Sequence, residues 1–244
     1  KTNTSHHSFH LTIGMSDAPR RRRRGNNDGD SAAPSTTTAS SSTTGSSAAS
    51  SKEYGYSQDI DQDALIKQDA ELFVPEKAPQ CFVKAKCISV TGNKVTVQIE
   101  ETGDTADFDK KDVHLRNPKK LEGTVDMASM TFLSEPAVLE NLRFRYDKNQ
   151  IYTYSGLFLV AVNPYKLLPI YTNEVIQKHS GKRKQDVEPH VFTISDVAYR
   201  QMLTNQINQS MLVTGESGAG KTENTKRVIQ YLTAIAGSHS GGGR

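Results

Sequence analysis

The sequence predicts an α/β fold that follows a small all-β domain and a disordered N-terminal tail. Three observations predict it. A glycine-rich turn at 215–220 joins an apolar strand to an amphipathic helix, short alternating strands occupy residues 76–126, and residues 1–71 are poor in periodic apolar positions. With 244 residues the chain is long enough for one or two domains.

The tail is recognised by its composition. The run Arg20–Arg24 leads into a tract of Ser, Thr, Ala and Gly, which buries too little apolar surface to offset chain entropy. We therefore predict that residues 1–71 are unfolded apart from a brief helix at Asp63–Leu72, and we leave residues 1–14, which precede Met15, out of the fold prediction. The arginines could form a nuclear address, an RNA or acidic-lipid patch, or a solvated charge run, and the third is favoured.

Charge and hydropathy narrow the class of protein. Within residues 1–51, Lys1 and Arg20–Arg24 outweigh three aspartates, so this segment holds all of the formal net charge of +3 and residues 52–244 are balanced. That balance gives no reason to propose nucleic acid as a partner. No apolar run approaches the roughly 20 residues of a membrane span, and no secretory signal is evident, so we expect a cytoplasmic protein.

The all-β domain is predicted from period-two alternation. Val95, Val97 and Ile99 alternate with polar residues, and further short strands are expected near 106–108 and 113–115, with turns at 91–93 and 102–104. The two cysteines, Cys81 and Cys87, have the same parity in a strand, so we expect both on its core face as free thiols. No site chemistry is visible here, which indicates a structural or protein-contact module.

Mixed elements follow Asn117. Ser134 is expected to cap a helix with Pro136 in its first turn and Val138, Leu139 and Leu142 on its apolar side. Strands are predicted at 151–154 and 157–162, the second covered on both faces because its apolar run is nearly continuous. Helices are predicted at 173–179 and 194–203.

The stretch from Met211 carries the chemistry. A buried strand at Met211–Thr214, a turn at 215–220 and a helix that begins at Lys221, with Val228, Leu232 and Ile235 on its apolar face, frame the pattern G-x-x-x-x-G-K-[ST]. In such a phosphate loop the glycines let backbone N–H groups converge on an anion, and the helix N-terminus adds its dipole. Lys221 would reach the β and γ phosphates, and the Thr222 hydroxyl would ligate Mg²⁺.

The loop and its flanks resemble a known family. Residues 215–232, GESGAGKTENTKRVIQYL, are similar to the phosphate loop and following helix of conventional (class II) myosin heavy chains. Further matches are IYTYSG at 151–156, VNPYK at 162–166, PHVF at 189–192 and SDVAYR at 195–200. Residues 121–139 resemble the entry to the motor head, and residues 76–126 resemble the Src-homology-3-like barrel before it.

This resemblance implies an actin-activated motor driven by Mg-ATP. It implies a truncated motor domain over 130–244 with an α/β P-loop NTPase fold, and in the complete protein ATP hydrolase activity, light chains, a coiled-coil homodimer and a cytoskeletal location. The implied ATP and Mg ligands are the phosphate loop, an adenine-side loop and two residues of the helix: Gly215, Glu216, Ser217, Gly218, Ala219, Gly220, Lys221 and Thr222; Asn163, Pro164, Tyr165, Lys166 and Tyr171; Glu223 and Asn224.

The chain departs from the family pattern in two ways. Leu167 stands where conventional members often carry tryptophan, and the switch segments, actin-binding cleft, converter and tail of the family have no counterpart in it. We therefore expect the piece alone to be inactive and unstable or partly unfolded; a protease-resistant core over 130–236 would contradict this. The alternatives are a different P-loop NTPase or kinase, and a product in which only the small barrel works as a protein-binding module.

Overall fold

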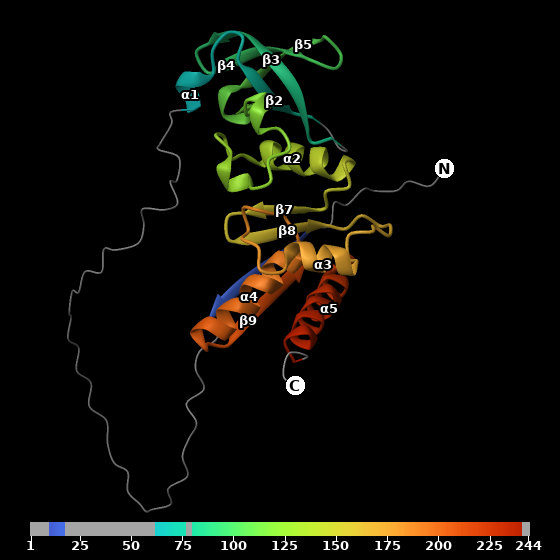
Figure 1. Ribbon diagram of the computed structural model, residues 1–244. Helices are drawn as coiled ribbons and strands as arrows, with labels where there is room; N and C mark the ends of the chain where they lie inside the picture. Colours follow the sequence, from blue (N-terminus) through green and yellow to red (C-terminus); the bar gives the residue numbers. More distant parts are fainter. Residues whose placement is uncertain (1–9, 18–61, 77–79, 241–244) are drawn as a thin grey trace, which may run out of the picture. The chain divides into compact units, whose positions relative to one another are not determined.

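The computed structural model describes residues 10–17, 62–76 and 80–240, all of which belong to one compact unit (Figure 1). They form two sheets. The first is a five-stranded antiparallel sheet with the strand order β5-β4-β3-β2-β6. Its strands are β2 (Glu71–Pro75), β3 (Phe82–Thr91), β4 (Lys94–Ile99), β5 (Thr105–Asp109) and β6 (His114–Leu115).

The alternation predicted for this sheet is confirmed in β4, where Val95 and Val97 are fully buried. The prediction for Cys81 was wrong. This residue precedes β3, has a left-handed backbone (φ 66°) and is exposed, whereas Cys87 is buried in the sheet core. The rule that every second residue lies on the same face applies only within a strand, and β3 begins only at Phe82. The two cysteines form no disulfide with each other.

The boundaries around β2 also differ from the prediction. The short helix α1 (Gln62–Leu65) ends well before Leu72, which is fully buried in β2. The sheet therefore begins at Glu71, five residues before the predicted start at 76. The reason is that β2 pairs with β3 on one side and, on the other, with β6, which is distant in sequence. Closure into a barrel stays a prediction.

Helix α2 (Glu135–Asp147) begins where Ser134 and Pro136 predicted, although the Ser134 hydroxyl forms no cap hydrogen bond and is buried without a partner. Its most buried face is not the apolar one that we expected, because Ala137, Asn141 and Arg145 lie on it. Arg145 is 2% exposed, and its guanidinium donates to three oxygens, each at 3.0 Å: Thr153 Oγ1, Gly123 O and Tyr152 O. These bonds allow a cation to be buried.

The second sheet has the strand order β7-β8-β1-β9. The hairpin β7 (Tyr152–Ser155) and β8 (Phe158–Val162) was predicted, and Leu159, Val160 and Ala161 are buried as expected. Strand β1 (His10–Asp17) was not predicted. It pairs antiparallel with both β8 and β9 (Gln209–Gly215), and Figure 1 shows it in blue beside β9.

Strand β1 lies inside the range predicted to be unfolded, and the structure differs from the prediction there. Leu11, Ile13 and Met15 alternate with small or polar residues, a pattern that a strand can use. Residues 18–61 lie outside the described residues, so their predicted disorder stays a prediction. Strand β9 is less buried than expected, since it is the edge strand of this sheet and Leu212 is 69% exposed.

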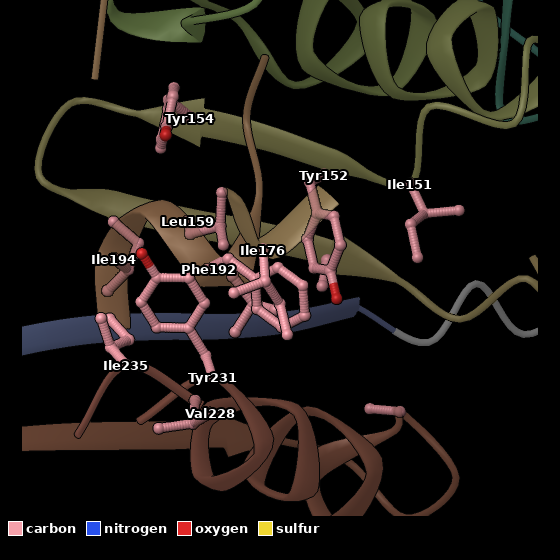
Figure 2. Close-up of a cluster of buried hydrophobic side chains, with 13 residues drawn as sticks. Ile151, Tyr152, Tyr154, Leu159, Ile176, Phe192, Ile194, Val228, Tyr231 and Ile235 are labelled. Carbon is pink, nitrogen blue, oxygen red and sulfur yellow. The ribbon is translucent and has the colours of Figure 1, made fainter. Parts of the chain in front are cut away.

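Three helices pack with the second sheet: α3 (Asn173–His179), α4 (Val191–Asn205) and α5 (Lys221–Ser240). Helix α3 has the predicted bounds, and α4 begins three residues before its predicted start. Figure 2 shows the core, in which the Phe192 and Tyr231 rings stack with centroids 5.1 Å apart. Val228 and Ile235 are buried as predicted, and Tyr231, which we did not predict, is fully buried.

The predicted all-β first part and the predicted α/β second part are both present, while a P-loop NTPase fold as such stays a prediction. Short 3-10 helices at Lys119–Leu121 and Met127–Ser129 lie between the two parts, and another, at Lys110–Asp112, lies within the first part between β5 and β6. In the ranges that the structure describes, no helix has both the length and the hydropathy required to cross a bilayer.

Candidate functional site

The phosphate loop lies between β9 and α5, as predicted. Gly218 (φ 81°) and Gly220 (φ 96°) adopt backbone angles that favour glycine over any residue with a Cβ. At Gly220 the backbone angle matters more than space, since an added Cβ would lie at ordinary contact distance, 3.5 Å, from Asn224 Nδ2. The spacing of the glycines is therefore explained by the path of the loop.

The loop presents backbone donors to an anion. The amide of Ala219 donates to Glu216 O at 3.2 Å, whereas the amides of Ser217, Gly218 and Gly220 donate to no acceptor among the described residues. The first turn of α5 adds N–H groups that a helix cannot satisfy internally. A polyphosphate would provide acceptors for all of these donors at once, so the donor set fits it.

Lys221 folds back over the loop. Its ammonium donates to Gly215 O and Glu216 O, both at 2.8 Å. Neutral carbonyls are weaker partners for an ammonium than phosphate oxygens are, so a bound phosphate would compete well for this group. Thr222 is exposed at the second position of α5. No cluster of three or more metal-ligating side chains occurs within the described ranges, so a metal there would depend on Thr222 and on ligands from the phosphates.

A cavity of about 460 Å³ adjoins the loop. The segment after β8 forms one wall, and Ala219, Gly220 and α5 form another. Asn163 Nδ2 donates to Gly218 O at 2.8 Å, and Asn163 Oδ1 accepts from Tyr165 N at 3.0 Å, so one side chain ties the two loops together. All seven residues predicted outside 215–222 line this cavity: Asn163, Pro164, Tyr165, Lys166, Tyr171, Glu223 and Asn224.

A buried hydrogen-bond network supports the floor of this cavity. Tyr152 Oη donates to Asn224 Oδ1 at 2.8 Å and lies 2.8 Å from Tyr171 Oη, while Asn224 Nδ2 donates to Gly220 O at 3.1 Å. Burial raises the pKa of Tyr152 well above its usual range, and burial also raises that of Tyr171, so both hydroxyls stay protonated. The network therefore connects the sheet to the phosphate loop.

Sequence reasoning missed two contributors to this cavity. The Arg227 guanidinium lies over the Tyr171 ring, 4.3 Å from its centroid, and 3.9 Å from a carboxylate oxygen of Glu223. The sequence could have pointed to Arg227 through its position four residues after Glu223, because residues four apart lie on the same face of a helix. The second missed residue is Tyr152, whose hydroxyl is brought to the cavity-lining Asn224 only by tertiary packing.

The charges around the cavity favour an anionic ligand. Lys166 and Arg227 line it together with a single carboxylate, Glu223, whose pKa is lowered by the hydrogen bond and charge of Lys226, 2.7 Å away. Leu167, at the position that departs from the resembled family, is 97% exposed at the rim. An exposed residue there affects packing little.

Comparison with known proteins agrees with the motifs. A model of the myosin head (motor domain) family matches residues 124–242. The non-muscle myosin-2 heavy chain of Acanthamoeba castellanii is 52% identical over 167 residues, which cover 68% of this chain and 11% of that protein. The chain thus spans about a tenth of the length of this relative. Residues 124–242 therefore belong to the myosin head family, and the chain is part of a conventional myosin heavy chain.

Proposed function

We propose that the chain forms the phosphate-binding and adenine-binding parts of a Mg-ATP site in an actin-based motor. One observation carries this proposal: the loop at 215–222, with its unpaired amides and its lysine, opens directly beside a cavity of nucleotide size whose lining is rich in flat and polar side chains. A nucleotide combines a polyphosphate with a planar base, so it would occupy the loop and the cavity at the same time.

Each residue then has a role. The amides of 216–222 and the Lys221 ammonium hold the phosphates, and the Thr222 hydroxyl is one ligand of Mg²⁺, which neutralises phosphate charge when bound. Pro164 and Tyr165 offer flat faces to the base, and Asn163 holds their loop against Gly218. Arg227 and Glu223 border the base end of the cavity.

The activity of the complete protein follows as part of the same proposal. It hydrolyses ATP and couples hydrolysis to movement on actin filaments in the cytoplasmic cytoskeleton, with light chains and a coiled-coil homodimer formed outside these 244 residues. Hydrolysis needs groups that sense the γ phosphate and position water. None of the residues given a role above does this, so we expect the 244-residue chain to bind nucleotide without turning it over at a motor's rate.

The test compares two lysines of one helix. Lys221→Ala removes the ammonium at the loop, and Lys226→Ala, the matched control, removes an exposed ammonium that pairs with Glu223. Titration of the 244-residue chain with a fluorescent ATP analogue and Mg²⁺ should show affinity lower by about 10- to 100-fold for Lys221→Ala, the equivalent of one charge-assisted hydrogen bond. The control should stay within about 3-fold.

Equal affinities for Lys221→Ala and the unaltered chain, with unchanged circular dichroism, would refute the proposed site. Repeating the pair of substitutions in the longer heavy chain extends the test to actin-activated turnover. There we expect Lys221→Ala to abolish turnover and Lys226→Ala to retain it.

A further inference from the structure

Two tyrosine hydroxyls meet behind the nucleotide cavity, and one of them faces a ligand. Tyr171 lines the cavity, whereas Tyr152 does not and is only 2% exposed. The Tyr152 side chain leaves β7 with its hydroxyl toward α5 (Figure 2). Its Oη lies 2.8 Å from Tyr171 Oη and 2.8 Å from Asn224 Oδ1. Tyr152 therefore stands between the loop asparagine and the tyrosine that a ligand meets.

Asn224 fixes the direction of these hydrogen bonds. Its Nδ2 donates to Gly220 O at 3.1 Å, and a carbonyl oxygen can only accept, so the orientation of the amide is determined. The Oδ1 atom then faces Tyr152. An amide oxygen has no proton to give, so Tyr152 donates its one hydroxyl proton to Asn224.

Tyr171 must consequently donate to Tyr152. A neutral phenol has a single proton, and that of Tyr152 is already used. Burial raises the pKa of both tyrosines, so neither hydroxyl loses its proton near neutral pH. The Tyr171 proton occupies the bond to Tyr152 Oη, and only lone pairs of Tyr171 Oη remain for the cavity. Toward a ligand, Tyr171 is an acceptor.

The Tyr171 ring is held where it is from several sides. The Arg227 guanidinium lies over it, 4.3 Å from the centroid, and the His190 and Phe192 rings contact it with centroids 5.6 and 6.0 Å away. Gln230 Nε2 donates to the Tyr171 carbonyl at 2.9 Å, and Gln230 Oε1 accepts from Arg227 at 3.0 Å. These contacts keep the hydroxyl from turning its proton to the cavity.

Other polar groups of the cavity agree with this polarity. Asn163 already uses its amide nitrogen for Gly218 O and its oxygen for Tyr165 N. Glu223 adds carboxylate acceptors to the lining, whereas the donor Lys166 is exposed. An exposed ammonium discriminates weakly, because water competes for it. The cavity is therefore suited to a base edge that carries N–H donors.

We propose that Asn224 and Tyr152 are positioning residues that set the base specificity of this site, which rests on the nucleotide site proposed above. By fixing Tyr171 as an acceptor, they favour a purine with an exocyclic amino group over one with a carbonyl in its place. A carbonyl would put two acceptors against each other, and neither would be paired. The same asparagine bonds the phosphate loop at Gly220, so one side chain serves both ends of the ligand.

The experiment measures the preference between two bases. Mg-ADP and Mg-IDP differ at carbon six of the purine, which carries an amino group in one and a carbonyl in the other, and neither has a γ phosphate to hydrolyse. Each displaces a fluorescent, ribose-labelled ADP from the longer heavy chain. We expect ADP to bind about 10- to 30-fold more tightly than IDP, as one hydrogen bond and one avoided mismatch would give.

Four variants test which residues set this ratio. Tyr152→Phe frees the Tyr171 proton, so the ratio should fall at least about 5-fold. Tyr154→Phe, the matched control, removes a buried hydroxyl of the same strand outside the cavity and should preserve the ratio. Asn224→Leu should lower the ratio as Tyr152→Phe does. Asn224→Asp keeps an oxygen acceptor for Tyr152 but loses the bond to Gly220 O, so it should keep the ratio even if both affinities fall.

Three results would overturn the proposal: equal affinities for ADP and IDP in the unaltered chain, an unchanged ratio in both Tyr152→Phe and Asn224→Leu, or equal ratios in Asn224→Asp and Asn224→Leu. The last would mean that Asn224 acts only as a structural residue. Failure of both nucleotides to bind would instead overturn the Mg-ATP site itself, which Lys221→Ala tests separately.

Discussion

Acid should destabilise this protein because two histidines are buried in their neutral form. His179 is 3% exposed and His190 is 5% exposed. Burial is the main cause that lowers the pKa of His179 from 6.5 to about 4 and that of His190 to about 3, and neighbouring cations add to the effect. The folded protein therefore resists protonation at these rings over a pH range in which the unfolded chain accepts it.

The sign and size of this effect of pH on the free energy of unfolding follow from the different proton binding of the folded and unfolded states. Well above pH 6.5 both states are neutral at these rings and stability is unaffected, whereas as the pH falls through 6.5 the unfolded state binds more protons and the protein becomes less stable. The loss continues down to about pH 4 for His179 and about pH 3 for His190. Between pH 6 and pH 5 each ring contributes about 1.2 kcal/mol, so the free energy of unfolding should drop by about 2 kcal/mol.

Urea unfolding of the 244-residue chain at several pH values measures this drop, with far-UV circular dichroism as the signal. Carboxylates with lowered pKa values, such as Glu174 and Asp186, are at the surface and add little above pH 5. The interval from pH 8 to pH 7 is the internal control, because histidines of the unfolded chain take up few protons there and the expected drop is only about 0.3 kcal/mol.

A variant assigns the effect to the histidines. His179→Gln keeps a polar group next to Thr193 Oγ1 but cannot titrate, so the drop between pH 6 and pH 5 should shrink to about 1 kcal/mol. Equal stability of the unaltered chain at pH 6 and pH 5 would refute the reasoning. So would a His179→Gln protein that loses the full 2 kcal/mol.

Three further predictions concern packing and the site. Arg145→Met should lower the free energy of unfolding by about 3–5 kcal/mol, because three buried acceptors lose their donor, while exposed Arg143→Met should change it by less than about 1 kcal/mol; urea titration compares them. Gly123→Ala should cost more than about 2 kcal/mol, since a Cβ there would overlap the Phe144 ring, whereas Gly92→Ala, with open space at a similar φ, should cost about 1 kcal/mol in the same assay. Tyr152→Phe should weaken ATP-analogue binding about 5-fold through loss of the hydrogen bond to the loop asparagine, and unchanged affinity would contradict that role.

The residues of the site differ in how far sequence could identify them. The phosphate loop is contiguous, so spacing alone placed Gly218, Gly220 and Lys221 correctly on one turn. The loop that begins at Asn163 required resemblance to a family, because a proline turn has no distinctive pattern of its own. Arg227 and Tyr152 were missed, since their roles depend on contacts with Tyr171 and Asn224 across elements.

The errors in the fold have a common cause. Cys81 was assigned to a strand face by parity, but the strand begins one residue later. For α2, Val138, Leu139 and Leu142 were predicted to form the apolar side, yet the most buried face carries Asn141 and Arg145, whose side chains bond to oxygens of Thr124 and Gly123. In both cases a local pattern was extended beyond the residues for which it holds.

The sequence by itself determined where most helices and strands of 82–240 lie and that the predicted phosphate loop of eight residues stands between a strand and a helix, because these depend on periodicity, caps and backbone angles of neighbours in the chain. Only the tertiary structure decided that β1 lies between β8 and β9 and that Tyr152 supports Asn224. Those features are set by packing between residues far apart in sequence, and such packing leaves no periodic signal in the chain.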